Sequence, residues 1–179
     1  KKHVKKLQLE NGEIIKEPSL VLKEQKKYYS ELYNSKLCNN DNDSLFFKQD
    51  NINRLSEDQK QAFENDITPL ECKESLMKFK DNKSPGNDGL TAEFYKFFWD
   101  DIKHILIGSF KESFRLGILS PSQKQAVITL IEKKNKDRSF LKNWRPISLL
   151  NTDYKILTKT FALRLIKVLP NIIHSNQSG

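Results

Sequence analysis

Two β-type runs in an otherwise helical sequence limit most strongly what this chain can fold into. Residues 125–131, QAVITLI, are rich in β-branched and apolar side chains, and residues 144–150 form a second extended run. The residues between them, 133–142, are polar and basic, which is typical of an exposed turn. The sequence therefore predicts one small antiparallel hairpin within a mainly helical chain, which is an α+β fold class.

Capping signals predict where two of the helices begin. Ser56 is followed three residues later by Gln59, and Thr68 is followed by Pro69 and Glu71. A hydroxyl at the N-cap and an amide or carboxylate at the third helical position satisfy backbone N–H groups that the first turn leaves open. Proline at the first helical position loses no helical hydrogen bond. We expect helices to start directly after Ser56 and after Thr68.

Apolar residues at helical spacing predict two longer helices, one before and one after the hairpin. The first covers residues 91–114 with Gly117 as its C-cap, and the second covers residues 152–169, where Pro170 ends it. The side chains expected to face inward are Phe94, Phe98, Ile102 and Ile105 in the first helix and Leu157, Phe161, Leu165 and Val168 in the second.

The net charge of +8 is concentrated in the second half of the chain. Residues 1–80 carry 15 lysines and arginines against 14 acids, whereas residues 81–179 carry 16 against 9. A basic half of this kind suggests a polyanionic partner, and a merely well-solvated surface explains the charge equally well. No acid follows Asp153, and the basic residues after it are Lys155, Lys159, Arg164 and Lys167.

Composition excludes several classes of protein. Hydrophobic residues make up 37% and charged residues 30% of the chain, as in soluble globular proteins. No apolar run has the length of a membrane span, and no leader resembles a signal peptide. Cys38 and Cys72 have neither disulfide-framework nor zinc spacing, so we expect an intracellular protein. Because Lys1 comes first and Met77 is the only methionine, we take the sequence as a piece of a longer one.

Hydrolytic and metal-binding motifs are absent from the sequence. It contains no GxSxG, HExxH or Walker loop, and its three histidines are isolated. Asp100 and Asp101 follow Trp99, as aspartates do in the metal-binding turn of polymerases, but that turn lies between two strands. Here the apolar residues around Asp100 and Asp101 recur at helical spacing. Adjacent side chains on a helix point about 100° apart, so these two carboxylates cannot easily share one metal ion. We therefore expect a solvated helix surface, with no catalytic and no metal-binding residue in the chain.

A glycine-rich turn and the hairpin cations are candidates for phosphate binding. The loop 84–89, SPGNDG, has backbone N–H groups that could receive a phosphate, although its residue types favour a structural turn between helices. Arg145 precedes Pro146, which biases it to extended geometry, and its planar fork suits a bidentate phosphate contact. Lys133 on the facing strand end adds a point charge. The pair predicts a triphosphate clamp, and a surface hairpin with ordinary salt bridges is the alternative.

Taken together, these segments resemble the reverse transcriptases of LINE-type (non-LTR) retrotransposons. The segments are KSPGNDGLTAEFYK at 83–96, VITLIEKKNKD at 127–137, NWRPISLLNTDYKILTKTFALRL at 143–165 and IIHSNQSG at 172–179. They occur in the order and at the spacing of that family. The resemblance covers residues 68–179, which would be the N-terminal motifs and fingers of an incomplete polymerase domain.

Residues 1–67 resemble only in general character the helical extension that joins the endonuclease and the polymerase in this family. Within them, residues 17–33 have a helical pattern, and residues 34–53 are typical of a linker.

The resemblance implies roles for individual residues. Lys133 and Arg145 would contact the triphosphate of the incoming nucleotide. Where the family often has proline and glycine around the first lysine, this chain has Glu132 and Lys134-Asn135, so Lys134 stays an alternative to Lys133. The residues implied in RNA template binding are Ser84, Gly86, Asn87, Asp88, Gly89, Thr91 and Lys155.

The same resemblance implies part of an RNA-directed DNA polymerase that has fingers but no palm. The aspartates that hold two Mg²⁺ ions come from the palm, downstream of residues 172–179. We therefore expect no cofactor in this chain, Mg²⁺ in the complete enzyme, and no polymerase activity of the chain alone.

The implied partners are template RNA, the RNA/DNA duplex, a dNTP and the palm and thumb of the same polypeptide, with no membrane. The implied locations are the nucleus and a cytoplasmic ribonucleoprotein. Two alternatives stay open: a non-enzymatic RNA-binding module derived from such an element, and a generic helical interaction domain.

Overall fold

The computed structural model describes residues 4–34 and 54–173, which belong to two compact units. Unit 1 comprises residues 1–47 and 128–148, and unit 2 comprises residues 48–127 and 149–179. The predicted linker at 34–53 and the family segment at 172–179 lie largely outside the described residues. The boundary predicted at residue 67 separates the helical extension from the polymerase motifs by their function, and this boundary stays a prediction.

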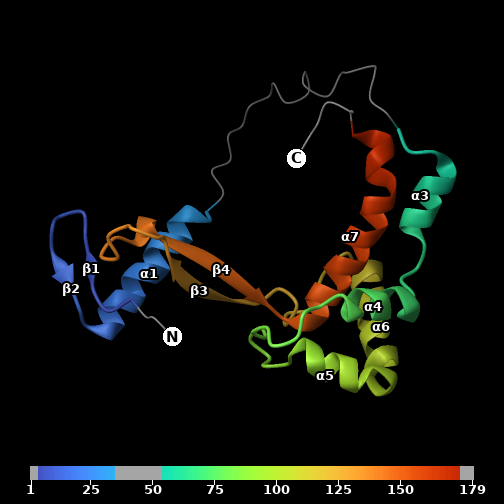
Figure 1. Cartoon of the computed structure of the whole chain (residues 1–179), viewed down its shortest axis with the longest axis horizontal. Coiled ribbons are helices and arrows are strands. Elements are labelled where there is room, and N and C mark those ends of the chain that lie inside the picture. Colours follow the sequence, from blue (N-terminus) through green and yellow to red (C-terminus); the bar gives the residue numbers. More distant parts are fainter. Residues whose placement is uncertain (1–3, 35–53, 174–179) are drawn as a thin grey trace. The chain divides into compact units, whose positions relative to one another are not determined.

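The described residues of unit 1 form an α-helix, a short 3₁₀ helix and two hairpins (Figure 1). Its elements are β1 (Leu7–Gln8), β2 (Ile14–Ile15), α1 (Pro18–Leu32), β3 (Ala126–Glu132), the 3₁₀ helix η1 (Leu141–Asn143) and β4 (Trp144–Leu150). The chain enters the unit within β3 and leaves it within β4. Its small core buries Leu7, Ile15, Val21 and Leu141 together, and Leu130 of β3 packs against this cluster. The hairpin predicted for residues 125–131 and 144–150 is thus present as β3 and β4.

The β1–β2 hairpin was not predicted as strands. Its turn is formed by Asn11 and Gly12, where Gly12 has a φ of 87°, a value that side chains disfavour. Leu7 pairs with Ile15 across the two antiparallel strands. Two-residue strands are too short for alternation of polar and apolar residues to reveal them.

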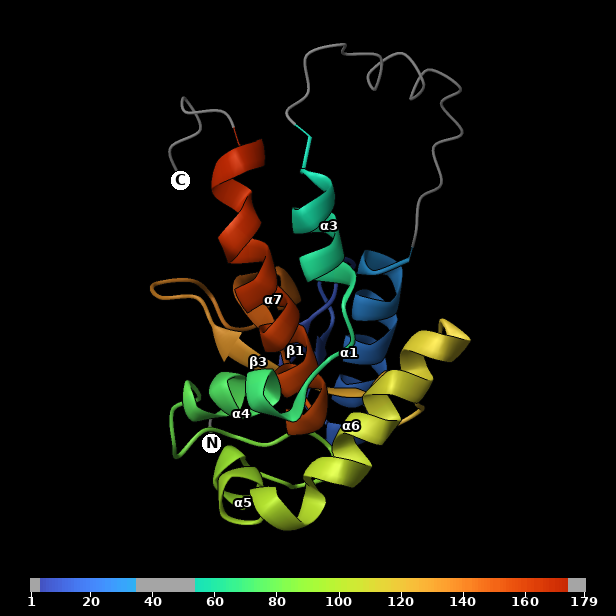
Figure 2. The same ribbon diagram turned by 90° about the vertical axis from the view of Figure 1, so that its right-hand side faces the viewer.

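Unit 2 is a helical body with one core. Its helices are α3 (Glu57–Glu64), α4 (Pro69–Met77), α5 (Ala92–Phe97), α6 (Trp99–Leu116) and α7 (Thr152–Ile172). Figures 1 and 2 show α3 beside α7, and α4 has its most extensive contacts with α7. Cys72 and Leu76 of α4, Phe110 of α6 and Ile156 of α7 are fully buried together.

Both predicted capping boxes are confirmed. Ser56 accepts a hydrogen bond from the backbone N–H of Gln59, whose side chain accepts one in return from the backbone N–H of Ser56. Thr68 and Glu71 make the same reciprocal pair, with Pro69 in the first turn of α4. These boxes need only residues within one turn, which explains why the sequence predicts them well.

The prediction of one continuous helix over residues 91–114 is wrong, because the structure has two helices there, α5 and α6. The chain leaves helical geometry at Phe98, with φ −93° and ψ 16°, and α6 begins anew at Trp99. This break shifts the buried face, so Ile105 is 78% exposed instead of inward. The buried residues of α6 are Trp99, Leu106, Ile107 and Phe110. The predicted C-cap is confirmed, because Gly117 adopts the left-handed conformation with φ 64°.

The buried stripe of α7 also differs from the predicted one. Leu157 and Val168 are buried as predicted, but Leu165 is 40% exposed. The stripe instead includes two polar side chains, Thr160 and Arg164, which a search for apolar spacing passes over. The Thr160 hydroxyl donates to the backbone oxygen of Ile156 and shares a second hydrogen bond with the Ser75 hydroxyl, so its burial is satisfied.

The predicted end of this helix at Pro170 is wrong, since α7 continues to Ile172. Proline removes only the hydrogen bond to the carbonyl four residues before it, that of Ile166. Ile166 is 56% exposed, so water can solvate the freed carbonyl.

Arg164 joins three helices of unit 2 through one guanidinium. Nε and Nη2 donate to the two carboxylate oxygens of Glu71 at 2.8 and 2.9 Å. Its Nη atoms also donate to the backbone oxygens of Phe63, Asn65 and Asp66 at 2.6 to 2.9 Å. The hydrogen bond from Arg164 is the main reason why the pKa of Glu71 is lowered to about 2. The ion pair therefore stabilises the fold above pH 4.5, and this contribution is lost as pH falls toward 2.

We predict that Arg164→Ala lowers the free energy of unfolding by about 3 kcal/mol, because it leaves Glu71 and three carbonyls without their donor. Arg115→Ala is the matched control, since Arg115 pairs with Glu112 on the exposed face of α6 and its loss costs at most about 1 kcal/mol. Urea unfolding at pH 7 measures both. Equal losses in the two variants would contradict the central role of Arg164.

Candidate nucleic-acid interface

Arg145 lies exposed on the β3–β4 hairpin. Its neighbour Trp144 is buried, and the indole N–H donates to the backbone oxygen of Arg138 at 2.9 Å. Successive side chains of a strand point to opposite faces, so the inward Trp144 directs Arg145 outward. Within residues 4–34 and 54–173, the Arg145 guanidinium has no hydrogen bond and no ion pair. It is therefore available to an anion.

Lys133 is engaged differently. Its backbone N–H donates to the Asn143 oxygen at 2.9 Å, and its ammonium donates to the Lys142 oxygen at 2.7 Å. The half-buried Lys133 thus closes the base of the turn, whereas the neighbouring Lys134 is exposed. Asn135 follows with a φ of 57°, a conformation that asparagine tolerates. Among the described residues, no hydrogen bond links the side chains of Lys133 and Arg145.

The glycine-rich loop of unit 2 is held by Asn151, which is 2% exposed. The Asn151 side-chain oxygen accepts from the Asp88 N–H at 3.4 Å, and its side-chain nitrogen donates to the Ser122 oxygen at 3.0 Å. A Cβ on Gly86 would lie 2.1 Å from the same side-chain oxygen. Gly86 is therefore required by the close approach of the loop to the start of α7.

Most polar groups of this loop bind within the protein. The Asp88 carboxylate accepts from the Leu90 N–H at 3.0 Å, and the Gly89 N–H donates to the Gly86 oxygen at 3.4 Å. The Asn87 side chain donates to Gln125 at 3.2 Å. Thr91 occupies the N-cap position of α5 without a side-chain capping bond. These bonds favour a structural turn over a phosphate cradle made of backbone N–H groups.

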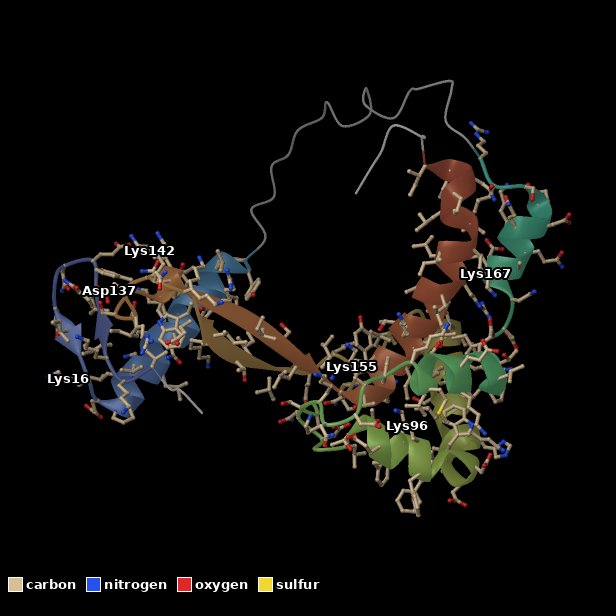
Figure 3. The ribbon with its side chains drawn as sticks, viewed as in Figure 1. Lys16, Lys96, Asp137, Lys142, Lys155 and Lys167 are labelled. Atoms are coloured by element: carbon tan, nitrogen blue, oxygen red, sulfur yellow. The ribbon has the colours of Figure 1, made fainter. Side chains whose placement is uncertain are left out.

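A lysine-rich groove has two main walls. One wall is the C-terminal end of α4 together with the loop that follows it, and the other is one face of α7. The volume of the groove is about 660 Å³. The side chains that line it are Lys78, Phe79, Lys80, Lys83, Ser84, Ala92, Thr152, Lys155, Thr158, Lys159 and Ala162. This lysine groove brings together Ser84 and Lys155, two of the predicted template residues, and Figure 3 shows Lys155 on α7.

Two acids in the segments that border the lysine groove, Asp81 and Glu93, are engaged elsewhere. Asp81 pairs with Lys96 of α5 at 2.6 Å, and the same ammonium donates to the Phe79 oxygen at 2.8 Å (Figure 3). Glu93 accepts from the Asn82 N–H at 2.5 Å. In the part of the chain that the structure describes, no acid lines the groove and none of its five lysines forms an ion pair. The groove therefore carries uncompensated positive charge.

Sequence reasoning missed most of this groove. Lys78, Lys80, Lys83 and Lys159 were not among the predicted residues. A signal exists in KFKDNK at 78–83, where lysines flank Phe79, but this stretch reads equally well as a helix end and a solvated loop. Only the packing of α4 on α7 brings it beside Lys159.

A half-buried acid lies at the start of α7. Burial raises the pKa of the Asp153 carboxyl, and Asp88 nearby adds a smaller rise. Burial also raises the pKa of Tyr95, with Asp153 as the next cause. Among the described residues, no three histidine, cysteine or acidic side chains are grouped so that they could hold a metal ion. Asp100 pairs with Lys103 on the surface of α6, and Asp101 is exposed, as predicted.

We predict that Gly86→Ala lowers the free energy of unfolding by about 1–3 kcal/mol, because the new methyl group overlaps Asn151. Gly108→Ala serves as its control: it lies in the interior of α6 with open space around it, and alanine there should raise the free energy of unfolding by about 0.5–1 kcal/mol. Thermal unfolding of both variants gives the comparison. A Gly86→Ala protein as stable as the parent would show that the loop is not held in this way.

Within the described ranges, no helix has the length and apolar character needed to cross a bilayer. No model of a known protein family matches the chain.

Two curated proteins are similar to it. An uncharacterized 149 kDa protein of transposon TX1 from Xenopus laevis is 37% identical over 178 residues, which cover 99% of this chain and 13% of that protein. A putative 115 kDa protein in the type-1 retrotransposable element R1DM of Drosophila melanogaster is 30% identical over 96 residues, covering 53% of this chain and 9% of that protein. The region that matches this chain is thus a small part of each of these longer proteins. The similarity supports a retrotransposon origin of the chain.

Proposed function

We propose that this chain is part of an RNA-directed DNA polymerase of a LINE-type retrotransposon, and that it contacts template RNA and the incoming nucleotide. The lysine groove is the observation that carries this proposal. It unites two template residues expected from the family resemblance with four more lysines that the resemblance did not supply. The similarity to proteins of transposable elements supports the same origin.

The chemistry of the lysine groove suits a single-stranded polynucleotide. Its lysines offer point charges for consecutive phosphates, and neutralising phosphates releases counterions. Phe79, Ala92 and Ala162 provide apolar surface on which bases can lie. The exposed Ser84 and Thr158 add hydroxyl oxygens that can accept a hydrogen bond from a 2′-OH.

On the hairpin, the free Arg145 guanidinium would hold the triphosphate of the nucleotide. Its fork matches two phosphate oxygens, whereas a lysine supplies a point charge. Lys133 already binds a backbone carbonyl, so Lys134 is a second candidate for this point charge.

Magnesium would supply the charge that activates the primer end and stabilises the leaving pyrophosphate when bound. Among the described residues, no three histidine, cysteine or acidic side chains are grouped so that they could hold this metal. This chain would therefore bind and orient RNA and nucleotide, while the carboxylates come from another part of the polypeptide. A non-enzymatic RNA-binding module is the second candidate, because the lysine groove alone would serve it.

We predict that Lys80→Gln combined with Lys83→Gln weakens binding of a single-stranded RNA 15-mer. The slope of log affinity against log salt should fall by about 1.4, since each phosphate contact to a single strand contributes about 0.7. Lys167→Gln is the control, because Lys167 is exposed on the same helix as Lys155 but lies outside the groove (Figure 3). Fluorescence anisotropy measures this slope between about 50 and 300 mM salt, the range over which affinity that depends on phosphate contacts falls. An unchanged slope in the double variant would overturn the groove as the RNA site.

We also predict that Arg145→Ala, introduced into the complete polymerase, lowers kcat/KM for dNTP about 10- to 100-fold, as expected for a lost charge-assisted contact. Arg138→Ala is the control, since Arg138 lies in the same hairpin turn but is paired with Glu132 at 2.5 Å. Primer extension on an RNA template provides the measurement. If kcat/KM stays unchanged in Arg145→Ala, the proposed nucleotide role of Arg145 is wrong.

A further inference from the structure

Unit 1 carries a groove that the proposed function leaves without a role. It lies between α1 and β3 and has a volume of about 760 Å³. Gln25, Lys26 and Tyr29 line it from α1, Tyr33 and Asn34 line it just beyond the helix, and Ile128 lines it from β3. All of these residues belong to unit 1, so the groove is formed within one compact body.

Two tyrosine rings form the aromatic part of this groove. The rings of Tyr29 and Tyr33 are stacked, with centroids 6.3 Å apart and planes inclined by 26°. Tyr29 is buried, whereas Tyr33 is 59% exposed. An exposed ring stacked on a buried one is held in place on one side and open on the other. It is therefore a ready platform for another planar group.

The Tyr29 hydroxyl is a second, independent sign of a ligand. The side chain is 93% buried, and its hydroxyl has no hydrogen-bond partner. Burial raises the pKa of Tyr29 to about 12, so at pH 7 the group is a neutral hydroxyl that can donate. Buried polar groups are normally hydrogen-bonded. A ligand with hydrogen-bonding edges that enters beside Tyr29 can supply the missing acceptor after a small side-chain shift.

The polar side chains of the groove indicate the chemical class of the ligand. Gln25 and Asn34 offer amide donors and acceptors, and Lys26 is an exposed ammonium without an ion pair among the described residues. No acid in the described ranges lines the groove. Residues 4–34 and 128–148 together carry 12 lysines and arginines against 7 acids. This combination fits a ligand that is planar, rich in hydrogen-bonding edges and negatively charged.

We propose that the α1–β3 groove binds a single-stranded nucleic acid, with one base stacked on Tyr33 and an adjacent phosphate on Lys26. Gln25 and Asn34 each offer a donor and an acceptor to the edge of that base or of its neighbour, so they suit more than one kind of base. Aromatic stacking with flanking cations accepts any base, so the site has little sequence preference. It is separate from the lysine groove, which belongs to unit 2, and it does not depend on the polymerase assignment. An extended peptide is the competing occupant, because Ile128 and Leu130 also line the groove with apolar surface.

The test uses the full chain and an oligouridine RNA 15-mer that carries 4-thiouridine. To remove the contribution of the lysine groove, binding is measured in the background of Lys80→Gln with Lys83→Gln. In this background Tyr33→Leu should weaken binding about tenfold, because leucine keeps apolar bulk but removes the stacking ring. Lys26→Gln should lower the salt slope by about 0.7. Lys23→Gln is the matched control, since Lys23 is exposed on the same helix but lies outside the groove.

The site of the photochemical crosslink decides between outcomes. A crosslink to Tyr33, located by mass spectrometry and lost in Tyr33→Leu, supports the proposal. Crosslinks confined to residues of the lysine groove, with Tyr33→Leu binding as tightly as its background, overturn it and leave the proposed function intact. In the unsubstituted chain, crosslinks at Tyr33 without any crosslink at the lysine groove would support the α1–β3 groove and count against the proposed function. Displacement of a bound apolar peptide without any crosslink to Tyr33 would assign the groove to a peptide.

Discussion

The bidentate ion pair between Arg164 and Glu71 is the interaction on which unit 2 depends most. Arg164 is 7% exposed, and a charge taken out of water is tolerated only when its donors are satisfied. The carboxylate accepts two hydrogen bonds from the guanidinium, and backbone oxygens at the end of α3 and just after it accept the others. Glu71 simultaneously completes the capping box of α4 with Thr68. One side chain of α7 thereby holds the end of α3 and the start of α4.

The lysine groove is a consequence of this packing. When α4 lies against α7, the lysines at the end of α4 and in the loop after it come beside those of α7. Like charges repel, so this arrangement opposes folding slightly. The contacts of Cys72 and Leu76 with Ile156 and Leu157 in the core offset that repulsion. A polyanion bound in the groove would remove this repulsion between the lysines. Unpaired lysines on opposite walls of a groove are therefore a stronger indication of a polyanionic ligand than the net charge of the chain.

Local signals were predicted correctly, and signals that depend on distant contacts were not. The capping boxes at Ser56 and Thr68 and the C-cap at Gly117 each involve residues within a turn of one another. The face of α6 was misjudged because a break at Phe98 changes the helical phase, and no residue type marks that break. The buried stripe of α7 was misjudged because Thr160 and Arg164 are polar, and their burial depends on Ser75 and Glu71, far away in the sequence.

The sequence by itself determined the starts of α3 and α4 and the presence of the hairpin, because capping boxes and β-type runs are properties of neighbouring residues. It also determined that the second half of the chain is basic. Only the tertiary structure decided which basic residues can meet a ligand: Arg164 is enclosed by carbonyls and a carboxylate, whereas Lys155 and Lys159 of the same helix face an open groove. The physical reason is that charge belongs to each residue, but burial and pairing depend on segments that only folding brings together.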